Sequence, residues 1–318
     1  MPKACLTACM MAPANRARSP RDHNDFPAKI DHTSVISGIR SMMSSIQPIC
    51  LITGASAGIG TALAHVFARH GHTLVLTARR KSQLDALAGA IAAKGHAHPH
   101  VIAVDLGAAD GTRQLVEILA ARGLEPAYVI NNAGFGLLGE AAILDRERQL
   151  AMIDLNVRAV TDLSLRFIAS VKRHKGGILN VASITAFVPG PGMAVYHATK
   201  SYVLSFTEAL HYELAADGVR VCALCPGPVP TEFFSLAGIP LDYIPRFLVR
   251  SASRVAQDGY EGLTGKQSVV VPGKPNRIFT LLPKLLPRAW VLAFMQRRWN
   301  RLLARTLKAG IREPERHE

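Results

Sequence analysis

The chain has 318 residues, 49% of them hydrophobic and 6% aromatic, which suffices for one large α/β domain or two small ones. Its longest uncharged stretches contain Gly, Pro, Asn and His, which argues against a membrane-spanning helix, and the N-terminus lacks a secretory signal pattern. The five cysteines form an odd, sparse set, typical of reduced thiols in a cytoplasmic protein.

The formal net charge of +14 is concentrated at the two ends of the chain. Residues 1–47 carry +3 and residues 273–318 carry +8, which leaves +3 for the whole region between them. This central region is close to neutral, so the charge gives no support for nucleic-acid binding by the body of the protein.

The first 47 residues show neither helical nor strand periodicity, and we predict a disordered lead over 1–47. Met42 lies just before the first apolar run, so a translation start there is an alternative to Met1. A transit peptide is less favoured, because three aspartates lie in this segment.

From residue 48 to residue 272, short apolar runs alternate with helical stretches. The runs are Ile49–Thr53, Thr73–Thr77, Val101–Val104, Tyr128–Ile130, Gly177–Val181, Val219–Leu224 and Ser268–Val271, and the helical stretches include Gly60–His70, Lys81–Lys94, Gly111–Arg122 and Ala198–Ala216. Strands that are apolar on both faces and alternate with helices indicate right-handed βαβ units. The pattern predicts a single Rossmann-type, doubly wound parallel sheet of about seven strands with helices on both faces.

A glycine-rich turn follows the first predicted strand and leads into a helix. It contains Gly54, Ser56, Gly58, Ile59 and Gly60. Glycines allow close approach to a pyrophosphate, and the free N–H groups of a helix N-terminus attract that phosphate. In this strand–turn–helix context the turn predicts a dinucleotide site.

The end of the second predicted strand bears on cofactor choice. Ala78 stands where an acid would bind the ribose of NAD, and Arg79 follows at once. A guanidinium binds a 2′-phosphate, so the sequence favours NADP(H). The alternative, that Arg79 only solvates the strand end, stays open.

At this point the sequence resembles the short-chain dehydrogenase/reductase family, whose fingerprint is T-G-x-x-x-G-x-G. The resemblance recurs, in the family's order, over about residues 50–232, and the two ends of the chain lie outside it. Its elements are Thr53–Gly60, Asn131–Gly134, Asn156, Ser183, Tyr196-x-x-x-Lys200 and Pro226-Gly227-x-Val229-x-Thr231. In one respect this chain departs from the family, since Ala57 stands where NADP enzymes often place a basic residue.

The resemblance implies further cofactor contacts. Asp105 would bond the adenine amino group, although capping the next helix is an open alternative. By the same resemblance, the group Asn132, Ala133 and Gly134 would line the adenosine side, and Pro226, Gly227, Val229 and Thr231 would orient the nicotinamide.

The reacting groups are expected on one helical face and at one strand end. Tyr196 and Lys200 are four residues apart, and a nearby ammonium favours the phenolate of an acid–base tyrosine. Ser183 would polarise the substrate oxygen. Asn156 resembles the family residue that bends a helix and anchors a water that leads to the lysine, with a backbone-bonded Asn as the alternative.

Two other groups suggest metal or redox chemistry but are interpreted otherwise. The alternating His96, His98 and His100 lack an acid or thiol to complete a shell, so no metal site is predicted. Cys222 and Cys225 lie within or just past an apolar strand, so they are interpreted as buried inert thiols.

Beyond the motifs, residues 232–260 are rich in Phe, Leu, Ile and Tyr and lie where members of the family place a substrate lid, so the resemblance implies a lid over a lipophilic substrate. Residues 273–318 form a basic extension in which Trp290, Phe294 and Trp299 recur at helical spacing. This extension would lie on a membrane surface or pack on protein, and the sequence leaves both open.

We therefore expect an NADP(H)-dependent oxidoreductase that interconverts a carbonyl and a secondary alcohol on a lipophilic small molecule. It is expected to be cytoplasmic, with peripheral membrane contact through 273–318 as one possibility. The alternatives are an inactive dinucleotide-binding sensor or scaffold and an NAD-dependent alcohol dehydrogenase. The substrate, the direction of reaction and a homo-oligomeric state are left open by the sequence.

Overall fold

A computed structural model of the chain describes residues 46–240 and 244–308. The predicted start near Met42, and all but two residues of the predicted lead, lie outside the described residues. Within the described part, no helix has the length and hydrophobicity needed to cross a bilayer.

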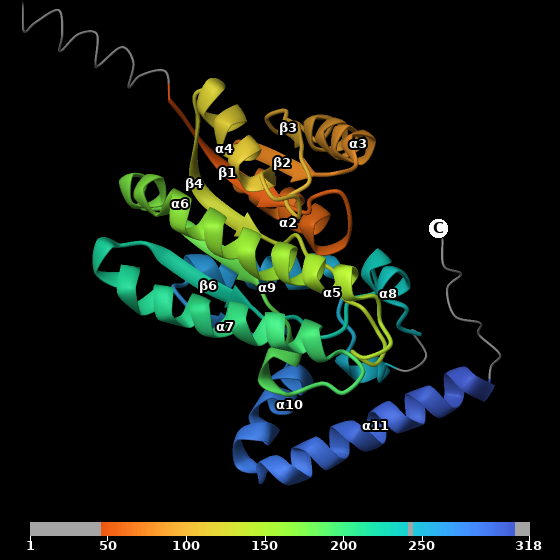
Figure 1. The fold of residues 1–318 in the computed structure, drawn as a ribbon. Coiled ribbons are helices and arrows are strands. Elements are labelled where there is room, and N and C mark those ends of the chain that lie inside the picture. The colour runs from red at the N-terminus through yellow and green to blue at the C-terminus, as the bar shows by residue number, and fades with distance from the viewer. Residues whose placement is uncertain (1–45, 241–243, 309–318) are drawn as a thin grey trace, which may run out of the picture. The chain divides into compact units, whose positions relative to one another are not determined.

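Seven parallel strands in the described residues form one sheet, in the order β3-β2-β1-β4-β5-β6-β7, as the sequence predicts (Figure 1). The strands are β1 (Gln47–Thr53), β2 (Leu74–Ala78), β3 (His100–Ala103), β4 (Leu124–Asn131), β5 (Gly177–Val181), β6 (Arg220–Leu224) and β7 (Val269–Val270). The order changes direction between β1 and β4, where the chain crosses from one half of the sheet to the other. In open α/β sheets such a crossing opens a crevice at the carboxyl ends of the strands.

Helices cover both faces of the sheet. They are α2 (Gly58–Arg69), α3 (Lys81–Ala92), α4 (Gly111–Ala121), α5 (Arg146–Ile153), α6 (Val160–Arg173), α7 (Ala194–Leu214), α8 (Glu232–Ala237) and α9 (Ala252–Thr264). Successive residues of a strand point to opposite faces. In β1, Cys50 and Ile52 pack in a core with α2, α3 and α9, whereas Ile49 and Leu51 pack in a second core with α4, α6 and α7.

One strand is longer than the sequence pattern indicates. We predicted a strand at Tyr128–Ile130, but β4 begins at Leu124 and includes Glu125. The Glu125 carboxylate is only 18% exposed and binds Arg173, the last residue of α6, and His174, the residue after it. These partners lie almost fifty residues away, so the acid interrupts the apolar pattern without interrupting the strand.

Two more helices follow the sheet, α10 (Lys274–Leu285) and α11 (Arg288–Lys308), and Figure 1 shows α11 as a long rod at the edge of the molecule. Two buried side chains join them to the body. Asn276 in α10 donates to the carbonyl oxygens of Leu248 and Pro272. Trp299 in α11 is 8% exposed.

Candidate active site

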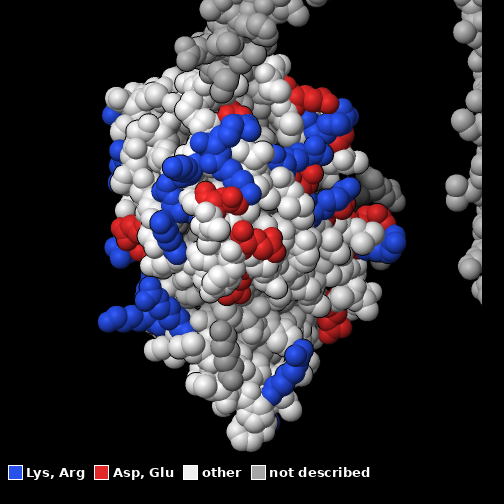
Figure 2. Space-filling view, turned by 90° about the vertical axis from the view of Figure 1, so that its left-hand side faces the viewer, with Lys and Arg blue, Asp and Glu red and all other residues white. Residues whose placement is uncertain are grey.

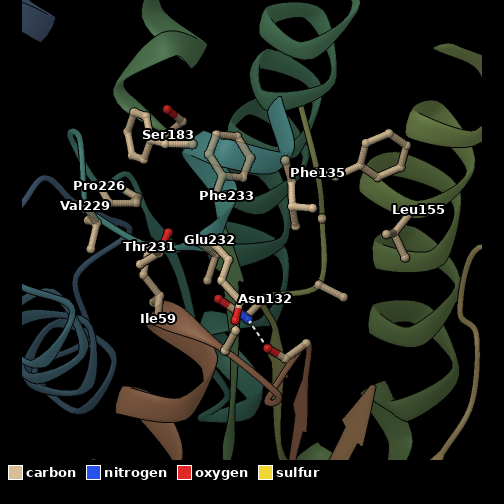
Figure 3. Close-up of a pocket in the computed structure, with 18 of the residues that line it drawn as sticks. Ile59, Asn132, Phe135, Leu155, Ser183, Pro226, Val229, Thr231, Glu232 and Phe233 are labelled. Carbon is tan, nitrogen blue, oxygen red and sulfur yellow. Dashed lines mark hydrogen bonds between the residues drawn. The ribbon is translucent and has the colours of Figure 1, made fainter. Parts of the chain in front are cut away.

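The carboxyl ends of the central strands enclose a cavity of about 570 Å³. Figure 3 shows Ser183 and Phe233 towards one end of it and Ile59 and Asn132 towards the other. All of the residues assigned to the site from the sequence line this cavity, except Gly60 and Asn156. Those that line it are Gly54, Ser56, Gly58, Ile59, Arg79, Asp105, Asn132, Ala133, Gly134, Ser183, Tyr196, Lys200, Pro226, Gly227, Val229 and Thr231.

The loop after β1 is shaped for close backbone approach. Gly58 has φ +59°, and a Cβ there would lie 2.9 Å from Thr231 Cγ2. Although Gly60 does not line the cavity, a Cβ on it would lie 2.2 Å from the carbonyl oxygen of Gly54, so only glycine fits. Among the described residues, no side chain caps the N-terminus of α2, and its first turn holds no acid. The first N–H groups of α2 are therefore available to an anion.

Two arginines follow β2 at the rim of the cavity. Arg79 is 76% exposed and lies 4.0 Å from the carboxylate of Asp105, a contact of little energetic weight at such exposure. Asp105 also accepts a hydrogen bond from the Gly107 N–H, so it forms a local turn and does not cap α4. Arg80 donates to Ser56 Oγ at 3.3 Å and to Glu232 Oε2 at 2.8 Å, which links the loop after β2 to the start of α8.

The segment after β4 is held against β1 by one buried hydroxyl. Thr53 Oγ1 accepts from the backbone N–H groups of Asn132 and Ala133, at 2.9 and 3.0 Å. The Asn132 side chain donates in return to the carbonyl oxygens of Thr53 and Gly54. These hydrogen bonds fix the start of the segment after β4 against the end of β1, where both line the cavity.

Tyr196 and Lys200 both lie in α7, one turn apart and facing the cavity. The helix begins at Ala194, whereas the sequence pattern predicted a start at Ala198. Lys200 Nζ lies 5.9 Å from the centre of the Tyr196 ring and donates to the Val181 carbonyl oxygen at 2.8 Å. Ser183 follows β5 and accepts a hydrogen bond from the Thr185 N–H, which leaves its own proton available to a substrate oxygen.

Burial dominates the electrostatics of this pair. Burial raises the pKa of Tyr196 to about 12, and the nearby hydroxyl groups of Ser183 and Thr185 only partly oppose this. Burial also lowers the pKa of Lys200 to about 8. We expect the Lys200 ammonium and the positive nicotinamide of NADP⁺ to favour the phenolate together, whereas in the protein alone desolvation is the largest effect on the pKa of Tyr196. Tyr196 stands in the cavity as a protonated phenol.

Asn156 lies outside the cavity wall, fully buried in a π-helical turn, Asp154–Ala159, between α5 and α6. Its amide exchanges two hydrogen bonds with the backbone of Phe135, at 3.1 and 2.9 Å, and donates to Thr199 Oγ1. Both alternatives considered for Asn156 are therefore partly present: the helix is distorted there, and the side chain bonds to backbone. Through these bonds Asn156 positions the loop after β4 beside α7.

One polar residue at the site was not identified from the sequence. Thr185 lines the cavity two residues after Ser183, and its Oγ1 is buried with no hydrogen bond of normal geometry among the described residues. It nevertheless lies close enough to Tyr196 to lower the pKa of the phenol. The short spacing from Ser183 after a strand end was the available signal.

Apolar side chains form the end of the cavity next to Tyr196. They include Phe135, Ile184, Met193, Phe233, Phe234, Leu236, Ile239 and Ile244. The Phe233 ring lies 5.5 Å from the Tyr196 ring, centre to centre. Several of these residues come from the predicted lid, of which residues 241–243 lie outside the described part. Phe247 points away and is 65% exposed.

The two cysteines considered for redox chemistry in the sequence do not line the cavity. Cys222 and Cys225 are fully buried at β6, and both are free thiols. Burial raises the pKa of the Cys222 thiol to about 12 and raises that of Cys225 as well. Both thiols are thus inert near neutral pH, as the sequence predicts.

Comparison with known proteins agrees with this geometry. The model of the short chain dehydrogenase family matches residues 48–237. A sulfoacetaldehyde reductase of Chromohalobacter salexigens is 37% identical over 185 residues, which are 57% of this chain and 72% of that protein.

Two solved structures share the fold over most of the chain. One is a short-chain dehydrogenase from Sphingobium yanoikuyae in complex with NADPH, with 29% identity and a TM-score of 0.65 over 86% of this chain and 99% of that one. The other is a bulky-bulky ketone specific alcohol dehydrogenase from Comamonas testosteroni, with 27% identity and a TM-score of 0.62 over 86% and 98%.

Proposed function

The chain belongs to the short-chain dehydrogenase family, and from this premise we propose that it reduces a lipophilic ketone with NADPH. The coarser statement, an oxidoreductase that acts on an alcohol or carbonyl group, follows from the family. One observation carries the proposal. A serine hydroxyl, a buried protonated phenol and a buried lysine converge at the apolar end of a cavity whose other end is a glycine-rich loop at a helix N-terminus.

The residues present fit a dinucleotide. The uncapped start of α2 offers N–H groups to a pyrophosphate, and Gly54, Gly58 and Gly60 remove the side chains that would block it. Asn132–Gly134 would lie along the adenosine, and Pro226–Thr231 along the nicotinamide. When bound, the cofactor supplies the hydride.

The preference for NADPH rests on the arginines after β2. No acid stands at Ala78 to repel a 2′-phosphate, and Arg79 is exposed at the rim of the cavity. Arg80 is a second candidate, although it now pairs with Glu232. The solved relative from Sphingobium yanoikuyae holds NADPH. The alternative is an NAD-dependent reaction, and a comparison of turnover with NADPH and with NADH distinguishes the two.

In the proposed reaction, the carbonyl oxygen sits between Ser183 and Tyr196. Ser183 donates a hydrogen bond that polarises the carbonyl as negative charge develops on its oxygen. Tyr196 then transfers its phenolic proton to that oxygen. In the direction of reduction the tyrosine acts as an acid, and burial raises its pKa further above neutral, so the phenol carries its proton before the reaction. Lys200 beside the ring stabilises the phenolate left behind.

The substrate end of the cavity favours an apolar ketone. Phe135, Met193, Phe233 and Leu236 line it, and Ile239 and Ile244 complete it from the segment after α8. Such a wall suits the bulky ketones named for the Comamonas testosteroni relative better than the charged sulfonate named for the Chromohalobacter salexigens relative.

The test is NADPH oxidation by the purified protein against matched ketones of increasing apolar bulk, with sulfoacetaldehyde and with NADH in parallel. The proposal predicts that kcat/KM rises with apolar bulk and that NADPH is preferred. NADPH binding without turnover of any ketone would favour the dinucleotide-binding sensor. Preference for sulfoacetaldehyde would contradict the lipophilic substrate, and preference for NADH would contradict the cofactor assignment.

A further inference from the structure

The two helices after the sheet carry charge of one sign only. Residues 274–308 hold nine Lys and Arg and no Asp or Glu. Five of these basic side chains are described as exposed, namely Lys274, Arg277, Arg288, Arg297 and Arg301. In Figure 2 the lower tip of the molecule, at the height of α10 and α11 in Figure 1, is mainly white with isolated basic side chains.

The apolar stripe of α10 faces outward. Ile278, Leu281, Leu282 and Leu285 follow the i, i+3, i+4, i+7 spacing of a helix face, and they are 59%, 53%, 47% and 80% exposed. In a globular protein this spacing marks the face that packs on the core. In α10 this face is exposed to solvent instead, although its residues have the spacing of a face that packs on a core.

Exposed apolar side chains recur in the first turns of α11. Trp290 is 67% exposed and Phe294, one turn later, is 53% exposed. Together with the four residues of α10 they define what we call the apolar face. Large exposed apolar surfaces on a soluble domain mark sites of interaction with another protein or with a membrane.

The opposite side of the same helices is already bound to the body. Asn276 fills the space at Gly227, where a Cβ would lie 2.4 Å from its Nδ2. Trp299 packs on Gly192, where a Cβ would lie 2.1 Å from Cε3 of the indole ring. The indole N–H donates to Glu140 Oε1 at 3.4 Å. The helices are thus held in place by their other faces, and the apolar face is left over after that packing.

The charge decides between candidate occupants. A second copy of this chain would bring one set of nine cations against another, and like charges across an interface oppose association. Residues 1–47 carry a net charge of +3, so their charge gives no attraction to the basic helices. An anionic lipid headgroup layer matches both the positive charge and the exposed apolar side chains, because it attracts Lys and Arg and accommodates Trp, Phe and Leu. We propose that the apolar face docks the protein on anionic membranes.

The docking surface is joined to the walls of the cavity. Gly227, which contacts Asn276, lines the cavity, and Gly192, which contacts Trp299, precedes the cavity residue Met193. A lipophilic ketone that partitions into the membrane would therefore be concentrated next to the enzyme. Vesicle binding itself is measured without substrate or cofactor, so the docking inference does not depend on the proposed reaction.

The experiment is co-sedimentation of the full-length protein with vesicles of phosphatidylcholine, alone or mixed with phosphatidylserine. We expect binding to the anionic vesicles to be at least about tenfold tighter. It should weaken when salt rises from about 0.1 M to about 1 M, because the Debye length falls from about 10 Å to about 3 Å.

A double variant removes the apolar face, and a matched one keeps it. Leu285→Glu with Trp290→Glu should abolish vesicle binding while ketone reduction in solution is retained. Ile143→Glu with Tyr212→Glu adds the same charge at side chains that are 73% and 76% exposed outside α10 and α11, and it should bind normally. If the first variant fails to fold, Arg297→Gln with Arg301→Gln should weaken anionic binding and leave the apolar face intact.

Three results would overturn the proposal. In the first, the wild type sediments equally with neutral and anionic vesicles, or with neither. In the second, the two Glu double variants bind vesicles alike. In the third, vesicle binding is not selective, and light scattering shows that Leu285→Glu with Trp290→Glu converts a dimer into monomers. The last result would assign the apolar face to a second copy of the chain.

Discussion

Replacing Lys200 by Met should stabilise the protein while it abolishes turnover. Lys200 is 6% exposed, and burial lowers its pKa from 10.5 to about 8. At pH 7 the side chain is therefore held in its charged form in a place that disfavours charge. Met keeps the length of the side chain and removes the charge.

The magnitude follows from that shift. One pKa unit corresponds to about 1.4 kcal/mol, so charging Lys200 in the folded state costs roughly 3 kcal/mol of unfolding free energy. Met also loses the 2.8 Å hydrogen bond to Val181, and a bond from a charged donor is worth about 1.5–3 kcal/mol. The net gain at pH 7 is therefore up to about 1.5 kcal/mol. Since each kcal/mol moves Tm by about 2–4 °C in domains of 150–250 residues, Tm should rise by up to about 6 °C.

The gain depends on pH with a defined sign. Between about pH 8 and 10.5 the unfolded chain binds the Lys200 proton and the folded chain does not, so wild-type stability rises with pH in this window. The advantage of Lys200→Met is complete below pH 8 and should shrink and reverse towards pH 10.5. Other groups titrate equally in both proteins and cancel in the difference.

Thermal unfolding of both proteins from pH 7 to pH 10 measures this difference directly. Lys94→Met, at an exposed lysine, is the control and should leave Tm unchanged. A lower Tm for Lys200→Met at pH 7, or a difference that stays constant with pH, would refute the reasoning about a charge buried for function.

Three further changes test the cofactor loop and the polar end of the site. Arg79→Ala should weaken NADPH about tenfold or more and NADH little, as binding titrations would show; equal losses would make Arg79 structural. Thr185→Val removes a buried hydroxyl beside Tyr196, so it should lower kcat about threefold to tenfold and leave the affinity for NADPH unchanged. The control Thr185→Ser keeps the hydroxyl and should retain kcat. An unchanged kcat for Thr185→Val would exclude a polar role of Thr185. Gly60→Ala places a Cβ 2.2 Å from the Gly54 carbonyl oxygen and should destabilise the loop by about 1–3 kcal/mol with loss of dinucleotide binding; normal binding would show that the loop is not fixed as described.

The sheet could be predicted because its strands are buried on both faces. A strand such as β5, Gly177–Val181, has no polar alternation to confuse with a helix, and its predicted bounds agree with the structure. The cavity residues could be predicted because each motif follows a strand end, and parallel strands bring their carboxyl ends together.

Element boundaries failed where distant partners replace local propensity. The first turn of α7 carries Val195, Tyr196 and His197, none a strong helix former, and the pattern delays the helix to Ala198. In the structure, Tyr196 is buried against Phe233, and His197 Nδ1 donates a hydrogen bond to the Val188 carbonyl oxygen, which stabilises the turn.

The electrostatics of the site could not be predicted from the sequence. The pKa of Tyr196 depends on its burial, which no spacing of residues reports. The pair Arg80 and Glu232 joins residues 152 apart, one in the loop after β2 and one at the start of α8, which meet only in the folded chain. The amphipathic spacing at Trp290 and Phe294 was visible, but whether that face packs on the body or lies in solvent required the structure.

The central claim, that Tyr196 delivers the proton to a ketone, is tested most directly by Tyr196→Phe. Phe keeps the ring that packs on Phe233 and removes only the transferable proton. Single-turnover NADPH oxidation should slow by about 10²–10⁴-fold, the usual contribution of a positioned acid, while the Kd for NADPH stays within a few-fold. A variant that retains more than roughly a tenth of the wild-type rate would contradict the account, because the loss would then be smaller than acid catalysis provides.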